Sequence, residues 1–174
     1  QLLAIDILPE KQWRTLMQKV ATPELIDRIH YEPLDITDLT PRRYADIIRR
    51  AWGIEPDAVD HVWISPPCES FSVANRNKVK HYSCRDQPKS PVAKAHLLAL
   101  TQVAETMMAH YKPGCKTLVQ LENPRSRFRR MPIIKRLLEH GFQLVNADHC
   151  MLRDPSLDGL FPKKPTDYIT LGQL

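Results

Sequence analysis

Apolar residues along the chain form two patterns, which are short continuous runs and longer segments with helical spacing. A short continuous run is typical of a buried strand, whereas apolar residues three and four positions apart are typical of an amphipathic helix. The continuous runs predict strands at residues 2–7, 59–64, 117–121, 142–147 and 168–171. The helical spacing predicts helices at residues 10–20, 23–30, 41–52, 91–111 and 131–140.

Strands and helices alternate in this pattern, and such alternation predicts an α/β sheet with right-handed crossovers. A chain of 174 residues is long enough to bury a core, so we expect a single domain over residues 1–174. The hydrophobic content of 43% and charged content of 26% are typical of a globular protein. No apolar run approaches the ~20 residues that span a bilayer. The first residues lack a signal-peptide pattern, so no membrane partner is expected.

The formal net charge of +5 and a pI near 9.1 favour a polyanionic partner. The four cysteines are scattered without a Cys-x-x-Cys pair. That distribution favours a reducing intracellular compartment, the nucleus or the cytoplasm, over a disulfide framework. His81-x-x-Cys84 has no second ligand pair nearby at zinc spacing, so we expect no metal site.

The apolar run that ends at Ile64 leads into Ser65, two prolines and Cys68. Consecutive prolines stiffen the backbone and direct it away from the strand. In open α/β sheets ligands bind just beyond the carboxyl ends of the strands, which is where this loop presents the thiol. A thiol held there suits a nucleophile. The alternative for a lone intracellular cysteine is a small buried hydrophobic residue.

Two motifs resemble those of the DNA cytosine methyltransferases that modify carbon 5. Ser-Pro-Pro-Cys-Glu-Ser-Phe-Ser-Val-Ala-Asn at residues 65–75 resembles the family's nucleophile motif, and Glu122-Asn123-Pro124 resembles its Glu-Asn-Val or Glu-Asn-Pro motif. The resemblance implies a Rossmann-like methyltransferase sheet with helices on both faces, and methyl transfer from S-adenosylmethionine to carbon 5 of cytosine in DNA. It implies that Cys68 attacks carbon 6 of a flipped cytosine. Glu122, followed by Asn123, would bind the ring nitrogen and amine; the structural alternative for Glu122 is a helix cap or an arginine partner.

The resemblance also implies a site for S-adenosylmethionine near the amino end of the chain. Residues 4–9, Ala-Ile-Asp-Ile-Leu-Pro, resemble the family's second strand, whose acid binds ribose hydroxyls. The Asp35-Ile36 pair resembles its third motif, whose acid contacts the adenine amine. The structural alternatives are a solvated strand end for Asp6 and a purely structural role for Asp35, with Asp38 or Thr40 as the cap of the helix at 41–52. The implied cofactor residues are Asp6, Ile7, Asp35, Ile36 and Pro66.

Basic residues gather in two segments, residues 75–90 and 125–130. A solvated surface is the ordinary explanation, but the first segment follows Cys68 directly and suits a mobile loop that closes over phosphates. The density of arginine in the second segment suits phosphate contacts as well. Where the family carries an Arg-x-Arg motif, this chain has two lysines without a guanidinium fork. The candidate nucleic-acid-binding residues are Ser70, Ser72, Arg76, Lys78, Arg125, Arg127, Arg129, Lys163 and Lys164.

The family's glycine-rich first motif, its target-recognition domain and its closing motifs are absent, and no glycine precedes Gly53. Because residue 1 is glutamine, we expect a processed chain or a fragment. If residues 2–7 form the family's second strand, its central first strand is missing, and an upstream segment or a partner chain is expected to complete the sheet. The alternative function is a catalytically inactive methyltransferase-like module that binds nucleic acid or a partner protein.

Overall fold

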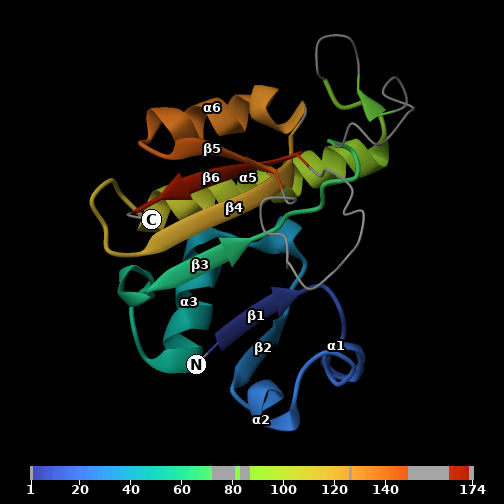
Figure 1. The fold of residues 1–174 in the computed structure, drawn as a ribbon, viewed down its shortest axis with the longest axis vertical. Helices are drawn as coiled ribbons and strands as arrows, with labels where there is room; N and C mark the ends of the chain where they lie inside the picture. The colour runs from blue at the N-terminus through green and yellow to red at the C-terminus, as the bar shows by residue number, and fades with distance from the viewer. Residues whose placement is uncertain (1, 72–80, 83–86, 126, 149–164, 173–174) are drawn as a thin grey trace.

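The computed structural model describes residues 2–71, 81–82, 87–125, 127–148 and 165–172, and shows a mixed α/β arrangement with two sheets (Figure 1). In the smaller sheet β1 (Leu2–Asp6) pairs in parallel with β2 (Ile29–Pro33). The larger sheet has the order β3-β4-β6-β5. Its strands are β3 (His61–Ile64), β4 (Leu118–Pro124), β5 (Gln143–Asp148) and β6 (Pro165–Leu171). β3 runs parallel to β4, and β6 runs antiparallel to both of its neighbours.

Prolines and capping side chains define where most helices begin. The α-helices in the described ranges are α1 (Glu10–Met17), α2 (Pro23–Ile26), α3 (Pro41–Trp52), α5 (Pro91–His110) and α6 (Pro132–Glu139). Proline occupies the first position of the last four, where its missing N–H costs no hydrogen bond. Thr40 caps α3 by accepting from Arg43 N, and Ser90 caps α5 by accepting from Ala93 N. Short 3₁₀ turns are η1 (Ile36–Asp38), η2 (Pro56–Ala58) and η3 (Arg127–Arg130).

The principal core lies between the larger sheet and the layer formed by α3, α5 and α6. Alternate strand residues, such as Val119, Leu121 and Ile169, contribute to it, and Leu100 and Val103 of α5 meet them with no more than 2% of their surface exposed. A smaller cluster on the opposite face of the β1–β2 sheet contains Trp13, Ile26 and Tyr31. Among the described residues, no helix is both long and apolar enough to cross a membrane.

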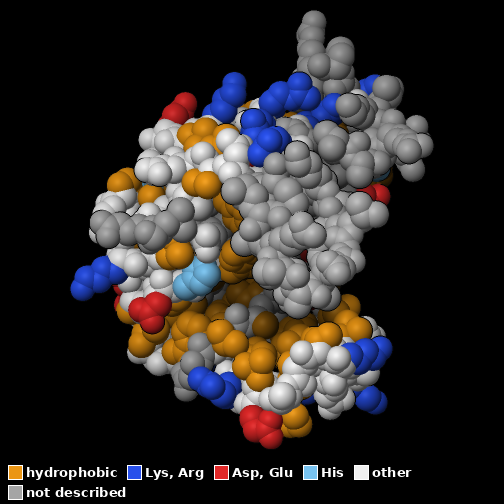
Figure 2. Space-filling view, viewed as in Figure 1, with side chains coloured by type: hydrophobic (Ala, Val, Ile, Leu, Met, Phe, Trp, Pro, Cys, Tyr) orange, Lys and Arg blue, Asp and Glu red, His pale blue; other side chains and the backbone are white. Residues whose placement is uncertain are grey.

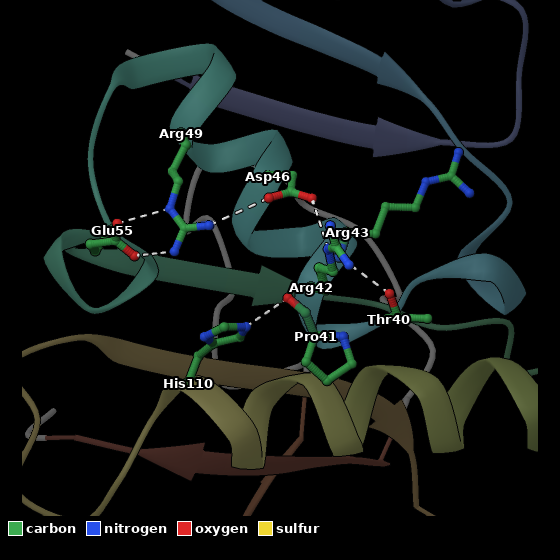
Figure 3. Close-up of polar contacts among 8 residues, drawn as sticks. All are labelled: Thr40, Pro41, Arg42, Arg43, Asp46, Arg49, Glu55 and His110. Atoms are coloured by element: carbon green, nitrogen blue, oxygen red, sulfur yellow. Dashed lines mark hydrogen bonds and ion pairs between the residues drawn. The ribbon is translucent and has the colours of Figure 1, made fainter.

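Polar contacts hold α3 against its neighbours (Figure 3). The Arg49 guanidinium makes two hydrogen bonds to the Glu55 carboxylate, at 2.8 and 2.7 Å, which tie the end of α3 to η2. Arg49 also pairs with Asp46 on the same helix. His110 Nε2 lies 2.8 Å from the carbonyl oxygen of Pro41 and links the end of α5 to the start of α3. These contacts fix the helix that lines one side of the cavity described below.

The first two predicted helices are longer than the helices that form. The prediction of a helix over 10–20 with a buried apolar stripe was partly wrong. α1 ends at Met17, and the side chains of Leu16 and Val20 are exposed. Only Trp13 is fully packed, stacked on Tyr31 with ring centroids 4.4 Å apart. The helix predicted at 23–30 ends at Ile26, because Ile29 begins the strand that pairs with β1.

Three strand predictions also need correction. The run at 59–64 was expected to be a buried strand, but β3 lies at the edge of its sheet and alternate residues are exposed. β4 extends past the predicted end to Pro124, so Glu122 is paired within the sheet rather than placed beyond it. The last strand is longer than predicted and lies between β4 and β5, where it pairs antiparallel with both.

Candidate functional site

The carboxyl ends of the parallel strands carry most of the described candidate residues. β1 and β3 point in the same direction in Figure 1, and each is parallel to its own neighbour, β2 or β4. Asp6 ends β1 and Asp35 follows β2, while Ser65 follows β3 and Glu122 lies near the end of β4. The sequence therefore brings acids and the Pro66-Pro67-Cys68 loop to the same edge.

The Cys68 loop is anchored by its flanking residues. Pro66 is buried, and the Cys68 thiol is free and half-buried. Phe71 N donates to the Cys68 carbonyl oxygen at 2.9 Å, and the Phe71 ring is 1% exposed. That ring packs edge-on against Phe128, at 6.3 Å between centroids. The turn after Cys68 is thus held by the core, and the thiol stands at the end of β3 as the sequence predicts.

Ser70 and His96 form a polar contact beside this loop. Ser70 is buried, and its Oγ lies 3.1 Å from His96 Nδ1. Desolvation lowers the pKa of His96, with a smaller opposing effect from the charge of Glu69. Ser70 was predicted to contact nucleic acid, whereas its observed partner is His96 on α5.

Glu122 is connected to the Cys68 loop by a direct hydrogen bond. The Ser65 hydroxyl donates to Glu122 Oε2 at 2.8 Å, across 57 residues of sequence. Glu122 is 8% exposed and lies opposite Tyr168 of β6. The structural alternatives for Glu122 were a helix cap or an arginine partner, whereas this contact is made by a serine of the nucleophile loop. Sequence reasoning missed Ser65, although it stands inside the motif.

Asn123 lies next to Glu122 but on the other face of the strand, because successive strand residues point to opposite faces. Its side chain is fully buried, and neither amide atom has a hydrogen-bond partner among the described residues. A buried polar group without a partner costs about 1–3 kcal/mol. The placement does not bring Asn123 to the same face as Glu122, so a direct contact of both side chains with one base is not favoured.

The arginines of residues 125–130 are not equivalent. Arg129 donates from Nε and Nη2 to the two oxygens of Asp167, at 2.9 and 2.6 Å, and its Nη2 also donates to Asn146. Asp167 is fully buried, and its hydrogen bonds raise the pKa of Arg129. Arg125 Nε lies 3.5 Å from Asp167 as well, and the Arg127 guanidinium lies over the Tyr82 ring. Arg129 was predicted to contact phosphate, and that contact stays a prediction; in the structure its charge balances a buried acid.

The two predicted cofactor acids lie on neighbouring strand ends. Leu34 N donates to the Asp6 carbonyl oxygen at 2.8 Å, so the end of β1 adjoins the residue before Asp35. Asp35 Oδ1 accepts from the backbone N and the hydroxyl of Thr37, and these bonds lower the pKa of Asp35. Asp35 thus caps η1, and Thr40, not Asp38, caps α3. Asp6 Oδ1 accepts from Leu8 N at 3.0 Å.

A cavity of about 200 Å³ lies between β1 and β3. Its floor consists of apolar side chains from α3 and α5, and Figure 2 shows a groove with hydrophobic side chains between the two parts of the molecule. Ile36 and Ser65 line it, whereas Ile7 is 66% exposed at the surface. The residues that line it include Leu3, Ile5, Leu39, Tyr44, Val62, Trp63, Ile64, Val103 and Met107.

Several candidates fall outside the described residues. Those candidates are Ser72, Arg76, Lys78, Lys163 and Lys164, together with Cys84. At the described end of the 75–90 segment, His81 is buried and its Nδ1 lies 2.7 Å from Ser90 Oγ. Within the described ranges no group of three or more His, Cys, Asp or Glu side chains is arranged to hold a metal ion.

Comparison with known proteins adds no further identification. Neither the family models nor the curated proteins that were searched gave a match to this chain.

Proposed function

We propose that this protein is a DNA cytosine methyltransferase that transfers a methyl group from S-adenosylmethionine to carbon 5 of cytosine through a covalent adduct with Cys68. The observation that supports this most directly is the hydrogen bond between Ser65 and Glu122. It joins the two motifs that carry the resemblance, although they lie on different strands and far apart in the sequence. The reaction uses a nucleophile and a carboxyl group that lie close enough to contact the same base.

The side chains have separate roles in the proposed reaction. The Cys68 thiolate attacks carbon 6 of a flipped cytosine, forming an S–C6 bond and moving the electron pair of the C5–C6 double bond toward carbon 5. The Glu122 carboxyl accepts a hydrogen bond from the amine and gives its proton to the ring nitrogen, which relieves the negative charge that develops there as the S–C6 bond forms. The Ser65 hydroxyl orients the Glu122 carboxylate. After carbon 5 has taken the methyl group, it loses its proton to water, the C5–C6 double bond re-forms and the S–C6 bond breaks. The thiolate is thereby restored, and the ring nitrogen returns its proton to Glu122.

The described residues fit part of a site for S-adenosylmethionine. Asp6 and Asp35 lie at adjacent strand ends, where carboxylates suit ribose hydroxyls and an adenine amine, and Ile36 lines the neighbouring cavity. Pro66 would border the methyl donor from the side of β3. When bound, the cofactor would supply an electrophilic methyl group. Residues 1–52 contain no glycine, so a glycine turn for the cofactor would come from other polypeptide.

The arrangement of strands supports a Rossmann-like sheet that lacks its first strand. In the methyltransferase sheet the first strand lies between the second strand and the strand that carries Pro-Pro-Cys. Here β1 and β3 are the strands on either side of the cavity. The net charge of +5 supports a DNA partner. The free cysteines Cys68 and Cys115 suit a reducing compartment such as the nucleus or the cytoplasm.

Methyl transfer is tested with the protein expressed together with any polypeptide encoded upstream of Gln1. Radiolabelled S-adenosylmethionine and a cytosine-containing duplex are supplied, and the labelled base is identified after DNA digestion. The proposal expects label on carbon 5 of cytosine and none with Cys68→Ser. If the wild-type protein binds the duplex but transfers no methyl group, the result contradicts the proposal and favours the inactive module.

A further inference from the structure

The edges of β1 and β3 that face the cavity carry backbone groups outside the observed ladders. On β1, Leu2 N donates to Arg28 O and Asp6 O accepts from Leu34 N, so the residues Leu2, Ala4 and Asp6 bond to β2. In a parallel ladder alternate residues bond to opposite sides. The backbone N–H and C=O groups of Leu3 and Ile5 therefore point away from β2.

The same alternation applies to β3. Asp60 O accepts from Leu118 N at 2.9 Å, so Asp60, Val62 and Ile64 bond to β4. The backbone groups of His61 and Trp63 consequently point away from β4. Leu3, Ile5, His61 and Trp63 all line the cavity between the two strands. Two strand edges with matching direction thus face each other across a groove (Figures 1 and 2).

We propose that this groove binds a single β-strand, parallel to β1 and β3, that is supplied by polypeptide joined upstream of Leu2. One such strand would pair on both sides and would merge the two sheets into a single sheet with the order β2-β1-new strand-β3-β4-β6-β5. Its side chains on one face would enter the apolar cavity lined by Tyr44, Val103 and Met107. Apolar residues at alternate positions are therefore expected on that face. The proposal rests on the strand arrangement and is independent of the proposed reaction.

The handedness of the connections indicates why the strand is upstream in the same chain. The link from β1 to β2 places α1 on the face that carries Ala4 and Tyr31. A strand in the groove that continued into β1 would move across the sheet in the same direction, and a right-handed crossover would lie on that same face. α3, which leads from β2 back to β3, lies on the opposite face, as the rule requires.

Two large apolar side chains are exposed on the face where this crossover would lie. Leu2 of β1 is 52% exposed and Trp63 of β3 is 55% exposed, and their two strands lie on opposite sides of the cavity. Both belong to the set of alternate residues that points away from the layer of α3 and α5. A separate strand would fill the groove, but it would leave these side chains exposed. An upstream strand with its crossover would cover them.

Amide hydrogen exchange measured by NMR tests the proposal in the protein expressed with its encoded upstream polypeptide. The four amides of Leu3, Ile5, His61 and Trp63 should be protected to within about tenfold of those of Ala4 and Val62. Ala4 and Val62 are internal controls, because their N–H groups already bond to β2 and β4. Cross-strand proton contacts from the four amides to upstream residues should accompany the protection.

Other outcomes would overturn the proposal. If the four amides exchange at the rate of unstructured amides while those of Ala4 and Val62 stay protected, the groove is open and the proposal is wrong. Protection that depends on protein concentration would identify a second copy as the occupant. Protection that appears only after another polypeptide is added would identify a separate partner. A gene that encodes no polypeptide upstream of Gln1 would exclude the proposed source.

Discussion

Replacing Ser65 with alanine tests the link between the two motifs without removing either of them. The substitution deletes one hydroxyl and, with it, the 2.8 Å hydrogen bond that this hydroxyl donates to Glu122 Oε2. A hydrogen bond to a charged group contributes about 1.5–3 kcal/mol. If the whole of this contribution is expressed in the transition state, Ser65→Ala lowers the rate of adduct formation by about ten- to a hundredfold.

The assay is single-turnover formation of a covalent complex with a duplex that contains 5-fluorocytosine. Thr101→Ala is the matched control, because Thr101 Oγ1 also makes a 2.8 Å hydrogen bond, to Leu97 O within α5. The control should react at the wild-type rate. The thermal unfolding midpoints of both variants should lie close to that of the wild type, since each variant lacks a single hydrogen bond. Ser65→Ala that folds normally and reacts as fast as Thr101→Ala would refute the orienting role of Ser65.

Three further predictions follow from the same geometry. Glu122→Gln should lose most turnover while its far-UV circular dichroism and unfolding midpoint stay near those of the wild type, and a variant that only unfolds would indicate a structural role. Arg129→Ala should lower the free energy of unfolding by about 3 kcal/mol, because it leaves the buried Asp167 without its main partner. Arg130→Ala, at an exposed position, should reduce the slope of log affinity against log salt by about one. Residues 1–174 alone should show no micromolar S-adenosylmethionine binding by calorimetry, and binding should appear when the missing strand and glycine turn are restored; micromolar binding by the isolated monomer would contradict the strand assignment.

The sequence predicted the first residue of a helix correctly where proline and a capping side chain mark that residue. Proline at the first position and a capping hydroxyl define the starts of α3 and α5, and both helices begin at the predicted residue. α2 ends earlier than predicted, because β2 begins at Ile29 to pair with β1. That constraint is tertiary, and residues 10–30 carry no local mark of it.

The sequence predicted which residues belong to the candidate site, but it did not predict the hydrogen bonds between them. That Cys68 and Glu122 come to the same edge of the sheet follows from two apolar runs and the rule for parallel sheets, although β4 continues two residues past Glu122. The Ser65 hydroxyl and the Arg129–Asp167 pair connect segments 57 and 38 residues apart, so no local pattern indicates them. β6 was predicted as a strand, but its antiparallel place between β4 and β5 depends on pairing that sequence alone does not specify.

The most direct test of the central claim is to locate the covalent bond itself. The protein with its upstream polypeptide is incubated with S-adenosylmethionine and a 5-fluorocytosine duplex, digested, and analysed by mass spectrometry. The account predicts a modified nucleotide attached to the peptide that contains Cys68, and no adduct with Cys68→Ser. An adduct at another cysteine, or equal adduct yields from the wild type and Cys68→Ser, would contradict it.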